Sequence, residues 1–332
     1  MKYTVGLGDM LAAFSPKGYK RFSQAYEYDL TYTGSEANVL ASLSCFGLNT
    51  KFVCRIPNND IGSAAIKYLN GLGIDTKYVV RGGKRLGVLY LEKGASQRSS
   101  RVIYDRLDSG ICESVPSDFD FEEIFKNANW FHFTGITPAL SKTTPKVIEK
   151  ACEVAKKNGC IISCDLNYRK NLWTSKKAIS VMDKLMKYVD VLIANEEDLE
   201  KALGIKTGKG IDDYVKAAQL VCEKYKLKAV ASAFRDSAGG SSVNWSGLLY
   251  TNGKAYLSKQ YLIQPVSMIA CGDSFSAGLI YAMQKNKKPQ DCVEFATAAG
   301  CLKHTIEYDY NLVSVDEVET LINNKGNGKV QR

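Results

Sequence analysis

Regular alternation of strand-like and helix-like segments in the second half of the chain constrains the fold more than any other feature. Such a succession predicts a mainly parallel sheet with helices on both faces. Ligands of these sheets bind at the carboxyl ends of the strands. The strand-like segments are 130–134, 160–165, 189–194 and 229–233, and the helix-like segments are 145–157, 176–188, 196–203 and 212–225. Polar residues follow the strands at 135, 165–169, 195–198 and 234–236.

Shorter strand-like segments in the first half predict a second, smaller sheet that covers a site as a lid. Two of them, 86–92 and 101–104, are joined by a polar turn, and an alternating stretch lies near residue 30. We expect one domain over residues 1–332, with lid strands from about 26–34 and 75–106. Tyr90, Tyr104 and Arg106 fall on or beside these strands.

Composition places the chain among soluble globular proteins, because 45% of its 332 residues are apolar and 24% are charged. It has no apolar run near the roughly 18 residues of a membrane span and no signal-like start, so a cytoplasmic protein without membrane partners is expected. The net charge of +9 comes from 44 basic and 35 acidic residues spread along the chain. Without a basic stripe interleaved with aromatic residues, this favours anionic small molecules over nucleic acid.

The ten cysteines lie mostly in apolar segments and form no Cys-x-x-Cys motif, which predicts reduced core thiols. Cys271 is the expected exception, because a thiol at a helix N-terminus has a lowered pKa and is reactive. His132 and His304 are the chain's two histidines, and we interpret both as core residues without metal.

Residues 270–278 read Ala-Cys-Gly-Asp-Ser-Phe-Ser-Ala-Gly and begin an apolar helical run. The first-turn N–H groups of a helix have no partner within it, and small residues let them point outward together. With the positive end of the helix dipole they form a phosphate site and keep Asp273 ionised. Asp273 can then act as the base of a phosphoryl transfer. An aspartate in the first turn of a buried helix is the open alternative.

A second helix start lies at 34–38, Gly-Ser-Glu-Ala-Asn. Ser35 is the predicted N-cap, with Asn38 exposed in the first turn. The Gly6-Leu7-Gly8 pair lacks the third glycine and the following helix of a dinucleotide fingerprint, which excludes that reading.

The chain resembles the PfkB, or ribokinase-like, family of carbohydrate kinases over nearly its whole length. Residues 270–273 match the Gly-Ala-Gly-Asp or Gly-Gly-Gly-Asp of that family, and residues 34–38 match in part its N-terminal pattern of two glycines and Asn. Within the family, kinases of 2-keto-3-deoxygluconate are most similar, through the blocks 91–98, 104–106, 130–136, 164–169 and 302–306. The resemblance implies a ribokinase-like α/β fold and ATP-dependent phosphorylation of that sugar acid, or a close aldonic acid, at its terminal hydroxyl.

The resemblance also implies a role for each matched residue. Asp273 would be the general base, and the N–H groups of Ala270, Cys271 and Gly272 the anion hole for the transferred phosphoryl group. The substrate would meet Asp273, Gly34 through its backbone, Asn38, Tyr90 and Tyr104 at its hydroxyls, and Arg106 and Arg169 at its carboxylate. Arginine suits a carboxylate because its planar fork bonds both oxygens.

The nucleotide side follows from the same resemblance. The nucleotide-binding residues would be Asn195, Asp198, Arg235, Gly240 and Gly272. Asn195 and Asp198 would organise Mg²⁺ and the triphosphate through water, without a direct protein ligand to the metal. The expected cofactors are ATP and Mg²⁺, the expected partners the sugar acid and ATP. A homo-oligomer could form through the exposed edge of the lid sheet.

Departures from the family pattern cluster near the expected site. They are Ala270 and Cys271 for glycines, Ser267 and Met268 for an acidic and a basic residue, Asp9 for Glu, Ala13 near an expected Arg, Thr33 for Gly, and Glu307-Tyr308 for Pro-Gly. A Cβ at a backbone position with positive φ costs on the order of 1 kcal/mol. They raise a second hypothesis beside the kinase, an impaired kinase that serves as a sugar-acid binding or regulatory protein. A kinase for another sugar is the third.

Overall fold

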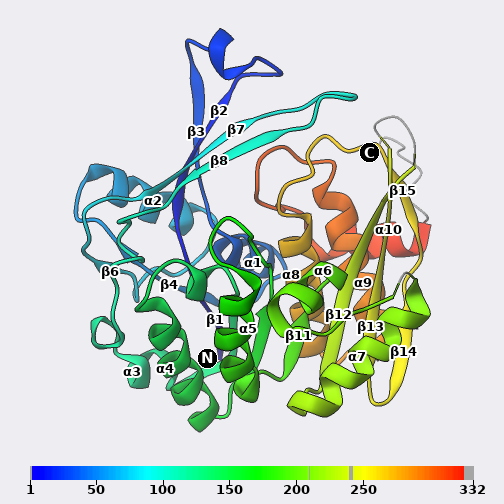
Figure 1. The fold of residues 1–332 in the computed structure, drawn as a ribbon. Coiled ribbons are helices and arrows are strands. Elements are labelled where there is room, and N and C mark those ends of the chain that lie inside the picture. The colour runs from blue at the N-terminus through cyan, green and yellow to red at the C-terminus, as the bar shows by residue number, and fades with distance from the viewer. Residues whose placement is uncertain (1, 209, 239–241, 325–332) are drawn as a thin grey trace.

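The predicted parallel sheet forms the centre of the molecule (Figure 1). The computed structural model describes residues 2–208, 210–238 and 242–324. In this part of the chain the strand order is β14-β13-β12-β11-β10-β9-β1-β4, with β15 beside β13. The strands from β4 to β12 run parallel, and β13 is antiparallel to its neighbours. Their bounds are β4 (Thr50–Val53), β1 (Tyr3–Leu7), β9 (Ala128–Thr134), β10 (Ile161–Asp165), β11 (Val191–Ile193), β12 (Ala229–Ser237), β13 (Val243–Thr251), β14 (Lys254–Leu257) and β15 (Tyr261–Ile263).

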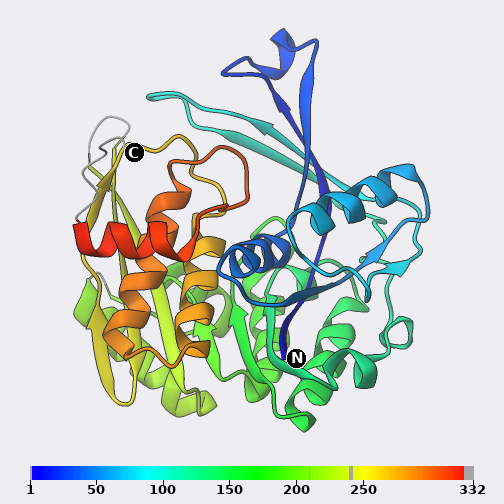
Figure 2. The same ribbon diagram turned by 180° about the vertical axis from the view of Figure 1, so that it is seen from behind.

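Helices cover both faces of this sheet, as the alternation predicts. The face toward the viewer in Figure 1 carries α3 (Phe121–Phe125), α4 (Thr144–Lys157), α5 (Ser175–Leu185), α6 (Glu196–Leu203) and α7 (Ile211–Tyr225). The face seen in Figure 2 carries α1 (Ser35–Cys45), α8 (Cys271–Gln284), α9 (Pro289–Lys303) and α10 (Val315–Asn324). Short 3₁₀ turns lie at Phe22–Gln24, Pro116–Asp118, Thr137–Ala139 and Met186–Tyr188. Helices α8 and α9 pack against each other, and α8 also packs against α1, which brings the two helix starts singled out in the sequence to one side.

A second sheet, the lid sheet, extends over the carboxyl ends of the parallel strands (Figure 1). Its order is β3-β2-β7-β8, with bounds β3 (Tyr28–Thr33), β2 (Leu11–Pro16), β7 (Gly87–Glu92) and β8 (Arg101–Asp105). Strands β3, β7 and β8 fall within the two segments from which a lid was expected. Strand β2 lies outside them, because Ala-Ala-Phe-Ser-Pro has little strand propensity of its own and is held by pairing on both sides.

The lid sheet contacts the body at two places. Leu11, Ala13, Leu89 and Leu91 form a small buried cluster on its inner face, against which Ile269 packs. Farther out, the Lys93 ammonium lies 3.0 Å from a Glu307 carboxylate oxygen and over the ring of Tyr308. The Tyr308 hydroxyl donates to Asp29 of β3 at 2.9 Å. Glu307 and Tyr308, where the resemblance leads us to expect Pro-Gly, therefore join the body to the lid.

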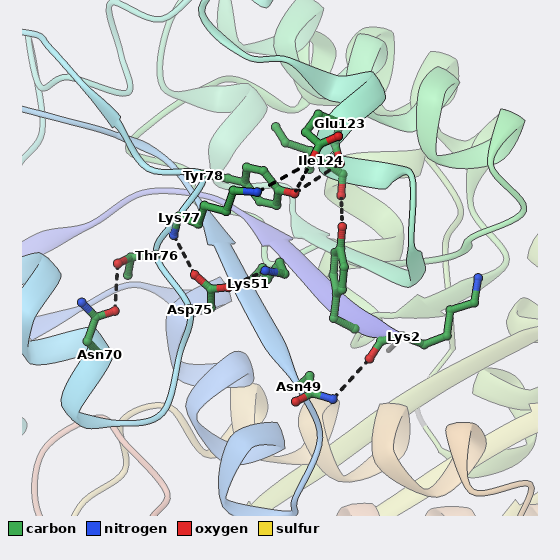
Figure 3. A network of polar contacts seen from close by, with 11 residues as sticks. Lys2, Asn49, Lys51, Asn70, Asp75, Thr76, Lys77, Tyr78, Glu123 and Ile124 are labelled. Atoms are coloured by element: carbon green, nitrogen blue, oxygen red, sulfur yellow. Dashed lines mark hydrogen bonds and ion pairs between the residues drawn. The ribbon is translucent and has the colours of Figure 1, made fainter.

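Polar contacts fasten the edge strand β4 to the segment that leads back to the lid (Figure 3). The Lys51 ammonium pairs with Asp75, whose other carboxylate oxygen accepts the Lys77 N–H at 2.8 Å. The Lys51 ammonium also lies 4.8 Å from the centre of the Tyr3 ring, and the Tyr3 hydroxyl donates to the Ile124 carbonyl at 2.9 Å. The short parallel pair β5 (Arg55–Ile56) and β6 (Val80–Arg81) continues this link, and α2 (Asp60–Gly71) lies between them in the chain.

Several local predictions need correction. Ser35 is the first residue of α1 and Gly34 is its N-cap, without a side-chain cap. Asn38 is buried, with 5% of its surface exposed, and so differs from the expected exposed position. A Cβ at Gly34 would lie 2.1 Å from the Asp9 carbonyl oxygen, so only glycine fits where the lid meets α1. Strand β12 extends beyond the expected 229–233, to Ser237, and pairs along its whole length with β13. Asn252 and Gly253 form the turn between β13 and β14, with φ of 51° and 73°, the positive values that such a hairpin turn requires.

The residues interpreted as core are buried. His132 and His304 have no exposed surface, and burial lowers their pKa to about 3 and about 4, so both are neutral. All ten cysteines are free thiols. Among the described residues, no helix is both long and apolar enough to span a membrane.

Candidate active site

A cavity of about 820 Å³ lies between the lid sheet and the carboxyl ends of the parallel strands. We call it the lid cavity. Of the residues expected at the site, it is lined by Gly34, Asn38, Tyr104, Arg106, Arg169, Asn195, Asp198, Arg235, Ala270, Cys271, Gly272 and Asp273. The structure therefore brings together residues that lie more than 200 positions apart in the sequence.

Two expected residues are not among them. Tyr90 stacks on Phe14 with ring centroids 5.8 Å apart and is partly exposed. Its neighbours Leu89 and Leu91 belong to the inner cluster of the lid, so alternation along β7 directs Tyr90 to the other face. Gly240 lies outside the described residues.

Helix α8 begins at the cavity wall, as the motif predicts. Ala270 is its N-cap, with φ 58° and ψ 16°, in the left-handed region that favours glycine. Gly272 follows in the first turn, where an added Cβ would have no atom within 4 Å. The first-turn N–H groups and the positive end of the helix dipole are thus next to the open cavity, an arrangement that suits an anion.

Cys271 differs from the prediction of a reactive thiol. Its side chain is 2% exposed, and burial raises its pKa to about 12. Desolvation of the thiolate outweighs the helix dipole and the nearby positive charges of Lys303 and Arg235. Its contribution to the lid cavity is therefore its backbone.

Asp273 lies in the first turn of α8 and is 7% exposed. Burial raises its pKa to about 6, although a hydrogen bond from Asn38 and the charge of Arg169 oppose the shift. The Asn38 side-chain amide donates to one Asp273 oxygen at 2.8 Å, and the Thr33 hydroxyl donates to the side-chain oxygen Oδ1 of Asn38 at 3.2 Å. This chain of hydrogen bonds fixes the carboxylate. A carboxyl group with this pKa is mostly ionised at neutral pH and can accept a proton.

Three arginines line the cavity, Arg106, Arg169 and Arg235, and give it positive charge. Arg106 stacks its guanidinium 4.2 Å from the centre of the Tyr104 ring, and its Nε lies 3.5 Å from a carboxylate oxygen of Asp9. Both oxygens of Asp9 are buried without a hydrogen bond in the described structure, and burial raises its pKa to about 6. Arg169 stabilises the ionised form of Asp273. Two guanidinium groups in one cavity suit a ligand that carries a carboxylate.

Asn195 and Asp198 form a capping box at the start of α6. The Asp198 N–H donates to Asn195 at 2.9 Å, the Asn195 N–H donates to Asp198 at 3.1 Å, and Asp198 also accepts the Tyr168 N–H at 2.8 Å. Asp165 lies close by, and burial together with the charges of Asp198 and Asp273 raises its pKa well above its usual value. The negative charges of Asp165 and Asp198 at the cavity wall suit a divalent cation. Because the oxygens of Asp198 already accept backbone N–H groups, they would contact Mg²⁺ through its bound water.

Sequence reasoning missed Asp309. It lines the lid cavity, is 6% exposed, and has its pKa raised by burial while a hydrogen bond with Thr33 and the charge of Lys303 oppose this. Its charge also raises the pKa of Asp273, so the two carboxyl groups lie near each other. Asp309 directly follows Glu307 and Tyr308, but it belongs to no sequence motif that would predict a role in the site.

The comparisons with known proteins identify the class of this protein. Residues 1–312 match the pattern of the PfkB family carbohydrate kinases, and the chain belongs to that family. It is a carbohydrate kinase with a ribokinase-like fold. A crystal structure of 2-dehydro-3-deoxygluconokinase from Thermotoga maritima is 45% identical, with a TM-score of 0.95 over 97% of this chain and 100% of that chain.

Two further proteins are similar to this chain over nearly its whole length. A PfkB family carbohydrate kinase from Listeria grayi is 32% identical, with a TM-score of 0.92 over 97% of this chain and 100% of that chain. The 2-dehydro-3-deoxygalactonokinase of Haloferax volcanii is 26% identical over 318 residues, or 96% of each chain.

Proposed function

We propose that this kinase phosphorylates 2-keto-3-deoxygluconate, or a close aldonic acid, at its terminal hydroxyl with ATP as donor. One observation carries the proposal. A buried carboxylate, Asp273, is held by Asn38 at the start of α8, in a cavity that also contains Arg106 and Arg169. Base, anion site and carboxylate-binding groups are the parts that phosphorylation of a sugar acid requires.

In the proposed mechanism Asp273 takes the proton of the substrate hydroxyl. The hydroxyl oxygen forms a bond to the γ-phosphorus of ATP, the bond from that phosphorus to the bridging oxygen breaks, and ADP leaves with the electron pair. The N–H groups of Ala270, Cys271 and Gly272 stabilise the charge on the transferred group. Bound Mg²⁺ would neutralise charge on the phosphates, held through water near Asn195 and Asp198.

The carboxylate end of the sugar acid would position it in the cavity. Arg106 and Arg169 would bind the carboxylate, which leaves the far hydroxyl at Asp273. Tyr104 lies beneath the Arg106 guanidinium and fixes its plane. The names of the relatives point to more than one keto-deoxy acid. The Thermotoga maritima protein is called a 2-dehydro-3-deoxygluconokinase, the Haloferax volcanii protein a 2-dehydro-3-deoxygalactonokinase, and a relative from Clostridium botulinum a 5-dehydro-2-deoxygluconokinase.

The test measures ADP release with ATP, Mg²⁺ and one acceptor at a time: 2-keto-3-deoxygluconate, 2-keto-3-deoxygalactonate, gluconate, ribose and fructose. We expect turnover with the keto-deoxy acids and little with ribose or fructose, which lack a carboxylate. Asp273→Asn should reduce turnover by a factor of about 10² to 10⁴. Asp212→Asn, in the first turn of α7, is the matched control and should not. Equal turnover of ribose, or an active Asp273→Asn variant, would contradict the proposal.

A further inference from the structure

Asp9 is a buried acid that meets the lid cavity only through another side chain. It lies between β1 of the body and β2 of the lid sheet, with 3% of its surface exposed. Arg106, which directly follows β8, lines the lid cavity, whereas Asp9 does not. A carboxylate oxygen of Asp9 lies 3.5 Å from Nε of Arg106. Asp9 therefore contacts the arginine from behind the cavity wall.

Within the described residues, Asp9 and Arg106 are each other's only opposite charge at ion-pair distance. Both Asp9 oxygens and Nε of Arg106 are enclosed and form no hydrogen bond there. A buried carboxylate without hydrogen bonds depends on an opposite charge, because removal of that charge leaves it uncompensated. Burial thus ties the Nε edge of the guanidinium to Asp9.

Other contacts hold the backbone and the plane of Arg106. Its carbonyl oxygen accepts the Ser109 N–H and the Cys112 thiol, each at 3.2 Å. Its guanidinium carbon lies 4.2 Å from the centre of the Tyr104 ring. Stacking on a ring sets the plane of a guanidinium but does not decide which of its edges faces the cavity. Asp9 decides this, because it holds Nε and leaves the two terminal nitrogens to a ligand.

We propose that Asp9 is a positioning residue for the sugar acid: by holding the Nε edge of Arg106, it presents Nη1 and Nη2 to the substrate carboxylate, which then binds end-on. The inference rests on the proposed function, in which Arg106 binds that carboxylate. Asp9 acts through Arg106 and touches neither the substrate nor the transferred phosphoryl group. An arginine that is oriented before binding costs less to order when the ligand arrives.

Two effects of Asp9 on affinity have opposite signs. Its negative charge repels a second carboxylate at the same arginine, whereas the fixed orientation of the guanidinium favours binding. Arg106 lies between the two carboxylates and offsets the charge of Asp9, so we expect orientation to prevail. Ordering one side chain of this kind corresponds to about two- to tenfold in affinity.

Steady-state kinetics test the direction of the effect. In Asp9→Asn we expect KM for the sugar acid to rise about fivefold, with kcat and KM for ATP within about twofold of the parent, because the reacting hydroxyl lies at the far end of the acid. Asp9→Glu keeps the carboxylate and should raise KM by no more than about twofold. Asp105→Asn is the matched control, because it removes the ion pair with Arg85 next to Arg106 in the chain, and its KM should stay within about twofold of the parent.

A double-mutant cycle shows whether Asp9 acts through Arg106. Arg106→Met fills similar space without the charge. In this background Asp9→Asn should change KM by less than about twofold, because the group that Asp9 positions is gone. An equal effect of Asp9→Asn in both backgrounds would identify an independent structural role and overturn the inference.

Two measurements do not depend on turnover. In a crystal structure of the parent with bound sugar acid, which needs no variant, the carboxylate should lie within hydrogen-bond distance of Nη1 and Nη2, with Nε facing Asp9. In the ligand-free protein, NMR of nitrogen-15 labelled arginines should show slow exchange of the Arg106 Nε–H with water, and faster exchange in Asp9→Asn. Arg106→Met assigns the signal.

An unchanged or lower KM in Asp9→Asn, the same loss in Asp9→Glu as in Asp9→Asn, or a carboxylate bound through Nε would overturn the inference. The two proposals fail in different ways. A parent that phosphorylates no sugar acid, with Nε–H exchange changed as expected, removes the proposed function and keeps the orientation of Arg106 by Asp9. An active parent with unchanged Nε–H exchange in Asp9→Asn removes the role of Asp9 alone.

Discussion

Ala270→Gly tests whether alanine at the start of α8 lowers the stability of the fold or the affinity for ATP. Ala270 has φ 58° and ψ 16°. A residue with a Cβ in this region costs about 1–2 kcal/mol. Glycine relieves that strain, but it adds conformational freedom to the unfolded chain worth about 0.4–1 kcal/mol. The free energy of unfolding should therefore rise by roughly 0.5–1 kcal/mol in the variant.

Ala270 has this conformation in the structure without a ligand, so the strain lowers the free energy of unfolding and does not depend on ATP. The entropy of unfolding is about 2.1 cal/mol/K per residue, or roughly 0.7 kcal/mol/K for 332 residues, which converts the gain into a rise of about 1 °C. The affinity for ATP should stay within about twofold, since a tenfold change would require 1.4 kcal/mol that acts on the bound state alone.

Differential scanning calorimetry and ATP titration calorimetry measure the two quantities. Ala282→Gly is the matched control, because it lies inside the same helix and should lower stability by about 0.5–1 kcal/mol. An unchanged melting temperature combined with tenfold tighter ATP binding in Ala270→Gly would refute the reasoning. The strain would then arise only when phosphate binds.

Three further predictions follow from the site and the lid. Activity should fall below about pH 6 as Asp273 is protonated. Because its pKa in the folded state lies above the unfolded value of 3.8, its ionisation lowers stability as the pH rises through this window, and Asp273→Asn should melt at a higher temperature at pH 7. Arg106→Lys should raise KM for the sugar acid about tenfold in steady-state assays and leave KM for ATP unchanged, because lysine lacks the planar fork. Tyr308→Phe removes the hydrogen bond to Asp29, worth about 1 kcal/mol, so exchange of the β3 amides should speed up about fivefold by mass spectrometry, whereas unchanged exchange would show that the bond does not hold the lid.

The sequence pattern predicted the parallel sheet, its two helical layers and the α8 helix start because these depend on local periodicity and on chain order. It missed β2, whose pairing between β3 and β7 is a tertiary effect. It also did not predict the face of the lid on which Tyr90 lies. Leu89 and Leu91 pack with Ile269 of the body, and this tertiary contact decides which face of β7 is buried.

Charges were harder to predict than elements. The thiol of Cys271 was expected to be reactive from its place at a helix end, but desolvation outweighs the dipole there. Asp309 has no motif of its own, and only the fold shows that it lines the lid cavity. The positions where the sequence departs from the family, Ala270 and Tyr308, do have positive φ of 58° and 59°, so the concern about backbone strain is justified.

The reaction rates of the buried thiols would report local unfolding of the protein. Seven of the ten cysteines are buried and three are partly exposed. Burial raises the pKa of Cys271 to about 12 and that of Cys160 to about 11, so an alkylating reagent reaches their thiolates only when the surrounding structure opens. Labelling at Cys271 would time the opening of the α8 start against that of the sheet at Cys160, without any added probe.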